Sequence, residues 1–306
     1  MRIMLTGGSG LAGHSILEAD GIEKFEVMSP SHQEMDLLDF SATYNYLMKC
    51  KPDFVIHAAG LVGGIEANRK APMMFLLQNL DMGRNLIYAC YQAGVKHLIN
   101  LGSSCMYPKD SDTSLSEDMV LQGELEPTNE GYALAKIVCA RLCSYISREH
   151  PELQYKTLIP CNLYGRWDKF RSERAHMIPA AIHKLHEAKR QNLPCVEIWG
   201  TGTARREFLY SEDFGACVVY CLEHFQAMPD MMNVGLGHDY TIDEYYQAAA
   251  EVVGYQGSFM HDTAHPEGMK RKLTDISRQL SFGWKARTSL SEGLSKTYEF
   301  YLQTDR

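Results

Sequence analysis

The amino-terminal segment joins a short apolar run to a glycine-rich turn. Residues 3–5 are apolar and lead into Thr6-Gly7-Gly8-Ser9-Gly10-Leu11-Ala12-Gly13, after which the sequence has helical character. The G-x-x-G-x-x-G spacing predicts a strand, a tight turn and the start of a helix. Small residues in such a turn let the backbone approach a pyrophosphate, and a helix amino terminus favours its negative charge. The segment therefore predicts a dinucleotide-binding unit.

Strands and helices alternate through the first half of the chain. We expect strands at Arg2–Thr6, Phe25–Met28, Phe54–His57, His97–Leu101 and Lys156–Pro160, and helices at Gly10–Ala19, Ser41–Lys49, Met73–Ala93 and Tyr132–His150. This alternation predicts an α/β fold, a doubly wound parallel (Rossmann) sheet with helices on both faces. Ligands of such sheets bind at the carboxyl ends of the strands.

The pattern changes after Leu163. Short strands are expected at 196–199 and 207–210, and helices near Pro179, at 213–225 and after two capping boxes that begin at Thr241 and Ser289. We therefore expect residues 1–162 to form the Rossmann domain, with segments at about 205–235 returning to it. Residues 163–306 are expected to form mainly a smaller α/β substrate-binding lobe.

The composition is that of an ordinary globular protein, with 45% hydrophobic and 22% charged residues. A net charge of -8 argues against nucleic-acid binding, and neither a signal peptide nor a membrane-spanning apolar run is expected. The nine cysteines are scattered and form no Cys-x-x-Cys pair, which predicts reduced thiols in the cytoplasm and no metal site. Cys139, Cys143, Cys217 and Cys221 are expected to be small core residues.

A tyrosine and a lysine lie four residues apart in Gly131-Tyr132-Ala133-Leu134-Ala135-Lys136. On a helix this spacing places both on one face. Because a neighbouring cation favours the phenolate, we expect Lys136 to lower the pKa of Tyr132 from its ordinary value near ~10. Such a phenol can protonate a carbonyl oxygen while hydride moves. An isolated Tyr-x-x-x-Lys pair is also typical of an exposed helix face.

A serine hydroxyl is expected at the end of the fourth strand, in addition to the glycine loop and the Tyr-Lys pair. Ser103, the glycine loop, Tyr132 and Lys136 together resemble the extended short-chain dehydrogenases/reductases. The resemblance narrows to the GDP-L-fucose synthase family in five blocks: HAAGLVGGIEAN (57–68), GSSCMYPK (102–109), LQGELEPTNEGYALAKI (121–137), CNLYG (161–165) and WGTGTARREF (199–208). That family epimerises GDP-4-keto-6-deoxy-mannose at C3 and C5 and reduces it at C4 with NADPH.

The resemblance implies a role for each site residue. Tyr132 would be the acid/base, Lys136 would hold the nicotinamide ribose, Ser103 would polarise the carbonyl, Cys105 would be the epimerisation base and His176 its acid. NADP(H) would be held by Gly7, Gly8, Ser9, Gly10, Leu11, Ala12, Gly13, His32, Leu37, Ala58, Ala59, Leu101, Gly102, Lys136, Pro160 and Leu163. The GDP-linked 4-keto-6-deoxy sugar would contact Asn162, Lys184, Trp199 and Arg206. Lys272 is a further candidate for the diphosphate, and a solvated surface is the alternative for its basic run 270–272.

Two features depart from the resemblance. Ser9 and the segment Ser29-Pro30-Ser31-His32 stand where relatives carry arginines for the 2′-phosphate. Because the second strand does not end in an acidic residue that would grip NAD and repel that phosphate, NADP(H) is still expected. Gly131 replaces a proline before the tyrosine, and residues 166–175 differ in a loop that borders the sugar, which leaves hexose and heptose substrates open.

Alternative functions remain open from the sequence. Ser104 and Cys105 stand where 4,6-dehydratases carry acidic residues, so dehydration is not expected. A reductase without epimerase activity, acting for example on a heptose, is one alternative, and a non-catalytic NADP-binding sensor or scaffold is another. By the same resemblance a homodimer is expected, with the helices at 73–93 and 132–150 pairing with their copies.

Overall fold

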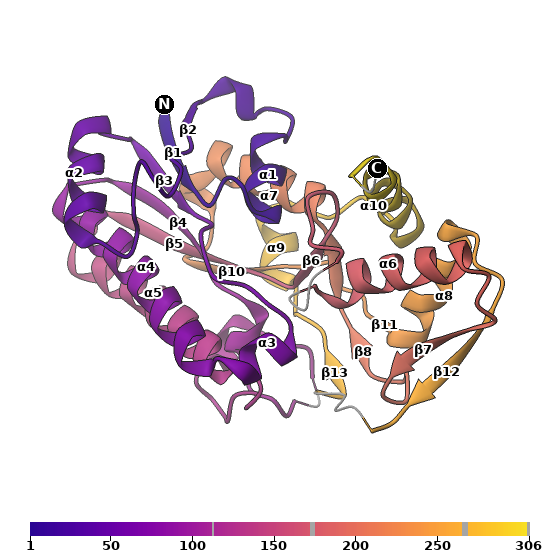
Figure 1. The fold of residues 1–306 in the computed structure, drawn as a ribbon. Coiled ribbons are helices and arrows are strands. Elements are labelled where there is room, and N and C mark those ends of the chain that lie inside the picture. Colours follow the sequence, from indigo (N-terminus) through magenta and orange to yellow (C-terminus); the bar gives the residue numbers. More distant parts are fainter. Residues whose placement is uncertain (112, 172–174, 265–268, 305–306) are drawn as a thin grey trace.

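A computed structural model describes residues 1–111, 113–171, 175–264 and 269–304. Its centre is a sheet of six parallel strands in the order β10-β5-β4-β3-β1-β2 (Figure 1). The strands are β1 (Arg2–Thr6), β2 (Glu26–Met28), β3 (Phe54–His57), β4 (His97–Leu101), β5 (Gln154–Pro160) and β10 (Met231–Val234). The predicted doubly wound Rossmann sheet is confirmed.

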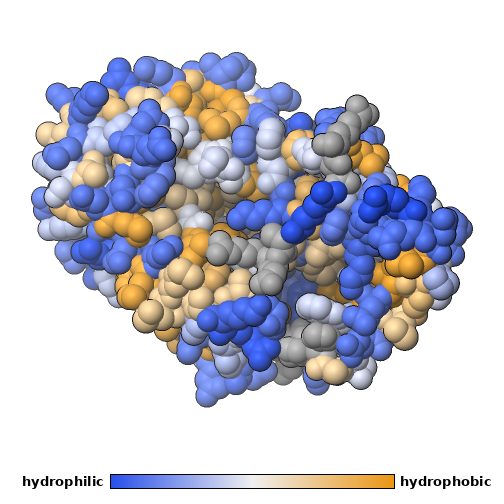
Figure 2. Space-filling view, in the orientation of Figure 1, coloured by the Kyte–Doolittle hydropathy of each residue, from blue (hydrophilic) through white to orange (hydrophobic). Residues whose placement is uncertain are grey.

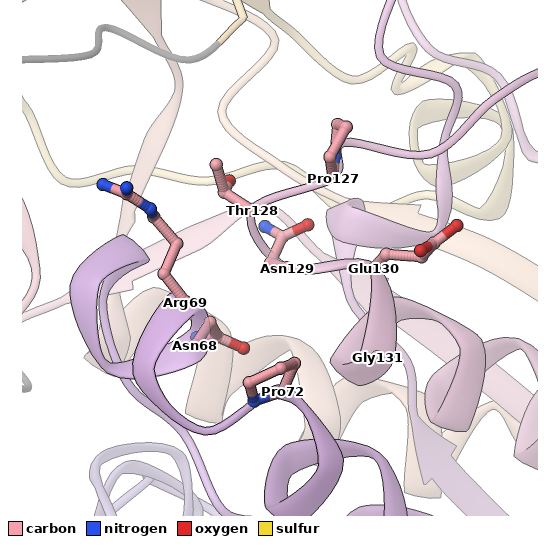
Figure 3. Close-up of a pocket in the computed structure, with 8 residues that line it drawn as sticks. All are labelled: Asn68, Arg69, Pro72, Pro127, Thr128, Asn129, Glu130 and Gly131. Carbon is pink, nitrogen blue, oxygen red and sulfur yellow. The ribbon is translucent and has the colours of Figure 1, made fainter.

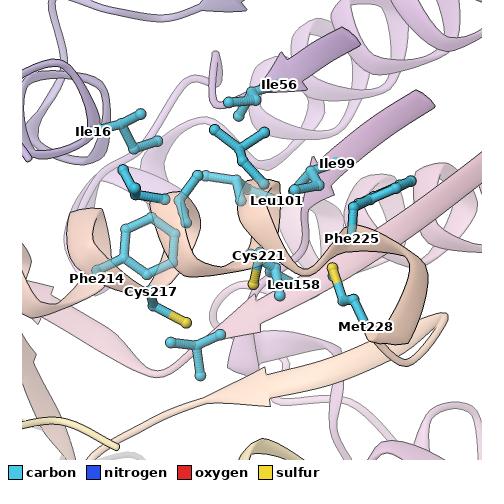
Figure 4. Close-up of a cluster of buried hydrophobic side chains, with 14 of the residues drawn as sticks. Ile16, Ile56, Ile99, Leu101, Leu158, Phe214, Cys217, Cys221, Phe225 and Met228 are labelled. Atoms are coloured by element: carbon cyan, nitrogen blue, oxygen red, sulfur yellow. The ribbon is translucent and has the colours of Figure 1, made fainter. Parts of the chain in front are cut away.

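Helices cover both faces of this sheet because alternate strand residues point to opposite sides. Met4, Val55 and Leu98 pack on one face in a cluster with α2 (Phe40–Cys50), α4 (Pro72–Gln92) and α5 (Glu130–Glu149). Ile56 and Ile99 point to the other face and pack with α1 (Leu11–Leu17) and α7 (Ser211–Glu223), as Figure 4 shows. The four cysteines expected in the core, Cys139, Cys143, Cys217 and Cys221, are all buried.

Two elements from the second half of the chain belong to this first body. α7 packs against α1, and β10 pairs in parallel with β5, with Met232 opposite Leu158. Asn233 in β10 is fully buried and its backbone N–H donates to Glu117 Oε1 at 2.7 Å. No strand was expected at 231–234, because this four-residue run has no clear alternation and its pairing partners lie far away in the chain.

The remaining elements build a second, smaller lobe (Figure 1). Its core lies among α6 (Met177–Arg190), α8 (Ile242–Val253), α10 (Leu290–Thr304) and β7 (Cys195–Trp199). β7 pairs with β12 (Ser258–Asp262), and β8 (Arg205–Arg206) lies between β11 (Tyr240–Thr241) and β13 (Arg271–Lys272). The predicted capping box is present at Thr241, whose side chain accepts from Glu244 N–H at 3.1 Å while Glu244 accepts from Thr241 N–H.

Shorter elements complete the fold. They include α3 (Ile65–Lys70), α9 (Ser277–Phe282), the strand pair β6 (Asn162–Tyr164) and β9 (Phe208–Tyr210), and 3-10 turns at Ile22–Lys24, Ser104–Met106, Glu117–Met119 and Phe225–Ala227. Within the described ranges, no helix combines the length and apolarity needed to cross a membrane. All nine cysteines lie in these ranges and are free thiols.

Candidate active site

The glycine loop closes tightly at the carboxyl end of β1. Gly7 has φ +75°, and a Cβ on it would lie 2.6 Å from Ala59 N. A Cβ on Gly13 would lie 2.1 Å from Gly7 O. Only glycine fits these two places, because any side chain would overlap the backbone of the β3 loop or of the turn itself. The loop thus presents bare backbone at the start of α1, which suits a pyrophosphate.

The segment after β2 differs from expectation. No carboxylate was expected near Ser31 and His32 to repel a phosphate. The turn after β2 nevertheless places two carboxylates beside these residues. Ser31 N–H and its hydroxyl both donate to Glu34 Oε2 at 2.8 Å. His32 Nδ1 lies 3.5 Å from Asp36 Oδ1, and both side chains are exposed.

The other predicted cofactor residues lie along the same edge of the sheet. Ala58 N–H donates to Thr6 O at 3.2 Å, and Ala59 N–H donates to Thr6 Oγ1 at 3.4 Å. Gly102 N–H donates to Leu158 O at 2.8 Å. Leu11, Ala12, Pro160 and Leu163 are half-buried, Gly8 is buried, and Ser9 and Gly10 are exposed. Leu37 differs from these, because its side chain is buried in the core cluster under α2 and α4.

Ser103, Tyr132 and Lys136 meet where β4 ends and α5 begins. Ser103 precedes the 3-10 turn Ser104–Met106 and hydrogen-bonds the Tyr132 phenol. The Lys136 ammonium is buried, donates to Leu101 O at 2.9 Å and lies 5.8 Å from the Tyr132 ring centroid. The predicted common face of Tyr132 and Lys136 is therefore present in α5.

The pKa of Tyr132 is shifted in the direction opposite to the one expected. Burial of the phenol raises its pKa, the nearby Cys105 raises it further, and the Ser103 hydrogen bond lowers it. Burial also lowers the pKa of Lys136. The expectation was wrong because it weighed the ammonium charge and not the loss of water around the phenol. A phenol that stays protonated through the neutral range suits a proton donor to a carbonyl oxygen.

Cys105 lies beside the same tyrosine and accepts two hydrogen bonds. Asn129 Nδ2 donates to Cys105 Sγ at 3.2 Å, and Lys272 Nζ donates to it at 3.4 Å. The backbone N–H of Cys105 donates to Ser103 Oγ at 3.2 Å, which fixes the turn that carries the thiol. An ammonium and an amide are therefore aimed at this one sulfur.

His176 is the N-cap residue of α6, and its side chain makes no capping hydrogen bond there. The pKa of His176 is lowered by burial and then by the charges of Lys272 and Lys169. Lys272 therefore links the two predicted epimerisation residues, because it contacts Cys105 and acts on His176. Residues 172–174, part of the loop at 166–175 that is expected to border the sugar, lie outside the described residues.

The predicted substrate residues form two groups. Lys184 Nζ lies 5.8 Å from the Trp199 ring centroid and donates to Glu197 O at 2.7 Å. Lys184 also lines a cavity of about 550 Å³ between α6 and β7. The second group adjoins the catalytic residues. Lys272 pairs in register with Arg206 across β13 and β8. Asn162 Nδ2 donates at 2.9 Å to the backbone O of Glu207, the residue that follows Arg206.

Asn129 is a site residue that the sequence reasoning missed. It lies three residues before Tyr132, about one helical turn away, and this spacing is the signal that could have identified it. Figure 3 shows it lining a cavity of about 190 Å³ with seven others: Asn68, Arg69, Pro72, Pro127, Thr128, Glu130 and Gly131. Asn68 Oδ1 and Asn129 Oδ1 are buried and accept no hydrogen bond from the described residues.

Comparisons with known proteins agree with this geometry. Residues 3–235 match the NAD dependent epimerase/dehydratase family. GDP-L-colitose synthase of Yersinia pseudotuberculosis is 51% identical over 99% of this chain and 98% of its own length. GDP-L-fucose synthase of Azorhizobium caulinodans is 42% identical over 98% of this chain and 96% of its own length.

One solved structure is similar to this chain over nearly its full length. The GDP-mannoheptose C4 reductase of Campylobacter jejuni with NADP bound superposes with a TM-score of 0.87 and 30% identity, over 98% of both chains. The protein therefore belongs to the NAD dependent epimerase/dehydratase family and, within it, to the group of the GDP-L-fucose synthases.

Proposed function

We propose that this chain is an NADPH-dependent C4 reductase of a GDP-linked 4-keto-6-deoxy sugar that also epimerises the sugar next to the ketone. The meeting of Ser103, Tyr132 and Cys105 at one strand end carries the proposal. One constellation then holds a proton donor for the C4 oxygen and a base for the adjacent carbons. The names of the colitose, fucose and heptose relatives support a GDP-sugar substrate.

The residues at the sheet edge fit a nicotinamide dinucleotide. The tight Gly7–Gly13 turn would receive the pyrophosphate, and Lys136, fixed by Leu101 O, would reach the nicotinamide ribose. The NADP-bound heptose reductase supports NADP(H) as the form used. When bound, NADPH supplies hydride to the carbonyl carbon.

The chain's own residues handle the protons. Tyr132 gives its proton to the C4 oxygen while Ser103 donates a hydrogen bond to the same oxygen. The ketone acidifies C3 and C5, Cys105 removes a proton there with its sulfur held by Lys272 and Asn129, and His176 returns one on the opposite face. Trp199, Lys184 and Arg206 present an aromatic ring and two cations to the GDP end.

Turnover in deuterated buffer tests both activities. The 4-keto precursors of GDP-L-fucose and GDP-L-colitose, with a heptose counterpart, would be supplied with NADPH, and deuterium at C3 and C5 read by NMR. We expect NADPH oxidation and solvent deuterium at C3, C5 or both. Oxidation without deuterium would identify a reductase that does not epimerise. No oxidation with any of these sugars would contradict the proposal.

Substitution of Cys105 separates the two steps. Cys105→Ser is expected to lower deuterium incorporation at least roughly 10²-fold, because it removes the base, while NADPH binding stays unchanged. Cys50→Ser is the matched control, since Cys50 is also a half-buried free thiol but lies at the end of α2. Equal deuterium incorporation in Cys105→Ser and the wild type would remove the cysteine from the mechanism.

We further propose that the chain is a cytoplasmic homodimer. Met73, Leu77, Leu134 and Val138 are exposed on α4 and α5, and Figure 2 shows apolar side chains gathering at the lower left, where Figure 1 draws these helices. Pairing with the same helices of a second copy would bury these side chains in a four-helix bundle. Nine free thiols support a reducing compartment.

Sedimentation tests the dimer. Wild type is expected at twice the chain mass, and the double variant Leu77→Glu/Val138→Glu at one chain mass, because two charges per copy would be buried. A wild type that sediments as one chain at micromolar concentration would reject the dimer.

A further inference from the structure

The turn after β2 holds a carboxylate on two hydrogen-bond donors. Ser31 N–H and the Ser31 hydroxyl both donate to Glu34 Oε2 at 2.8 Å. These bonds lower the pKa of Glu34, so it is charged at neutral pH. Asp36 lies close by, 3.5 Å from His32 Nδ1. Two acidic groups therefore flank this turn.

This turn lies where the adenosine ribose of a dinucleotide would be. β1 and β2 run in parallel with Met4 opposite Met28, so their carboxyl ends share one edge. Ser29 packs directly on the glycine loop, because a Cβ on Gly8 would lie 2.0 Å from Ser29 Oγ. In doubly wound folds a carboxylate after the second strand binds the ribose 2′-hydroxyl of NAD, and an arginine accommodates the 2′-phosphate of NADP.

The segment that contains the glycine loop and this turn offers that phosphate few cations. Residues 7–36 contain no arginine, and their one lysine, Lys24, contacts Glu223 at 2.6 Å. The donors that remain for an anion after β2 include Ser31 N–H and its hydroxyl, and Glu34 already binds both.

We propose that Glu34 is a specificity-determining residue that competes with the cofactor 2′-phosphate for the two Ser31 donors, so that the chain discriminates only weakly between NADPH and NADH. This inference rests on the proposed use of a nicotinamide dinucleotide. NADH carries no 2′-phosphate and leaves the Ser31–Glu34 pair intact. The 2′-phosphate of NADPH is a second anion at the Ser31 donors, which the Glu34 carboxylate already occupies. Like charges in contact repel.

Direct binding without the sugar tests the inference. Dissociation constants for NADPH and NADH would be read from the fluorescence of the bound nicotinamide. Glu34→Gln keeps the size of the side chain and removes its charge, and is expected to tighten NADPH about fivefold while NADH changes less than twofold. The gain should shrink as salt is raised, since exposed charges are screened.

Two further variants sharpen the test. Glu26→Gln is the matched control, because Glu26 is an exposed carboxylate at the opposite end of β2, and it should leave both constants unchanged. Ser31→Ala in the Glu34→Gln background should weaken NADPH binding and leave NADH binding unchanged. Glu34→Gln that shifts both cofactors equally, or shifts neither, would overturn this inference alone. A wild type that binds neither dinucleotide would overturn it together with the proposed function.

Discussion

For single residues, burial is the largest cause of the pKa shifts of the catalytic groups. Tyr132 and Lys136 share a helix face, yet burial raises the pKa of the phenol and lowers that of the ammonium. At His176 the charge of Lys272 adds to burial, and both lower the pKa of the imidazole. The site thus holds a neutral acid and a sulfur held by two donors within one small region.

Replacement of the phenol tests this residue-scale chemistry. Tyr132→Phe removes the proton donor and is expected to lower the rate of NADPH oxidation by roughly 10²–10⁴-fold, with an unchanged circular dichroism spectrum. Tyr145→Phe, at an exposed position of α5, should turn over normally. Comparable rates for Tyr132→Phe and wild type would exclude the phenol as the acid.

At the scale of elements, the approach of α4 and α5 positions the tyrosine. Gly131 precedes the tyrosine at the point where the two helices meet: a Cβ there would lie 2.8 Å from Pro72 O and 3.3 Å from Leu76 Cβ. The absence of a side chain allows the two helix amino termini to touch. Tyr132 is the next residue, so the contact also places the phenol.

A methyl group at this position should therefore be harmful. Gly131→Ala is expected to destabilise the fold by about 1–3 kcal/mol through overpacking, although alanine normally stabilises a helix interior relative to glycine. Urea unfolding gives the free energy, and kcat should fall with it because Tyr132 shifts. Ser144→Ala, at another exposed site on α5, is the control. A variant as stable as wild type would show that the helices can move apart freely.

At the scale of the whole molecule, buried titratable groups couple folding to pH. His57 ends β3, is only 2% exposed, and its Nδ1 lies 3.0 Å from Thr6 Oγ1 at the end of β1. Burial, with help from the Lys136 charge, lowers its pKa to about 3. The unfolded chain takes up this proton near ~6.5 and the folded chain does not. Stability is therefore lost as the pH falls from about 6.5 towards about 3.

The size of this effect can be measured. One proton bound only by the unfolded state costs about 1.4 kcal/mol of unfolding free energy per pH unit. His57→Gln should lose less stability between pH 7 and pH 5 than wild type does. Below pH 6.5 its slope of unfolding free energy against pH should be smaller by up to about 1.4 kcal/mol per pH unit. His224→Gln, at an exposed position, should keep the wild-type slope. Equal slopes for His57→Gln and wild type would mean that His57 keeps an ordinary pKa in the fold.

The loop between β6 and α6 contacts elements of both bodies. Arg166 donates to Oε2 of Glu18, the residue that follows α1, at 2.9 Å and to Glu212 Oε1 in α7 at 2.5 Å. Trp167 stacks on His14 at 3.9 Å between ring centroids and lies against Phe300 of α10. The loop between β6 and α6 is thereby attached to the helix that follows the glycine turn.

Local patterns in the sequence determined the framework. β1, β3 and β4 have the predicted bounds, because short apolar runs between turn residues specify buried strands without help from distant parts. The glycine turn, the Tyr132–Lys136 helix face and the Thr241 capping box are local in the same sense. Tertiary structure alone decided what meets at the site. Lys272 reaches Cys105 across 167 positions of sequence, β10 joins the sheet through β5, and burial reverses the shift expected for Tyr132. No local pattern encodes such contacts, because desolvation and long-range pairing depend on where the whole chain packs.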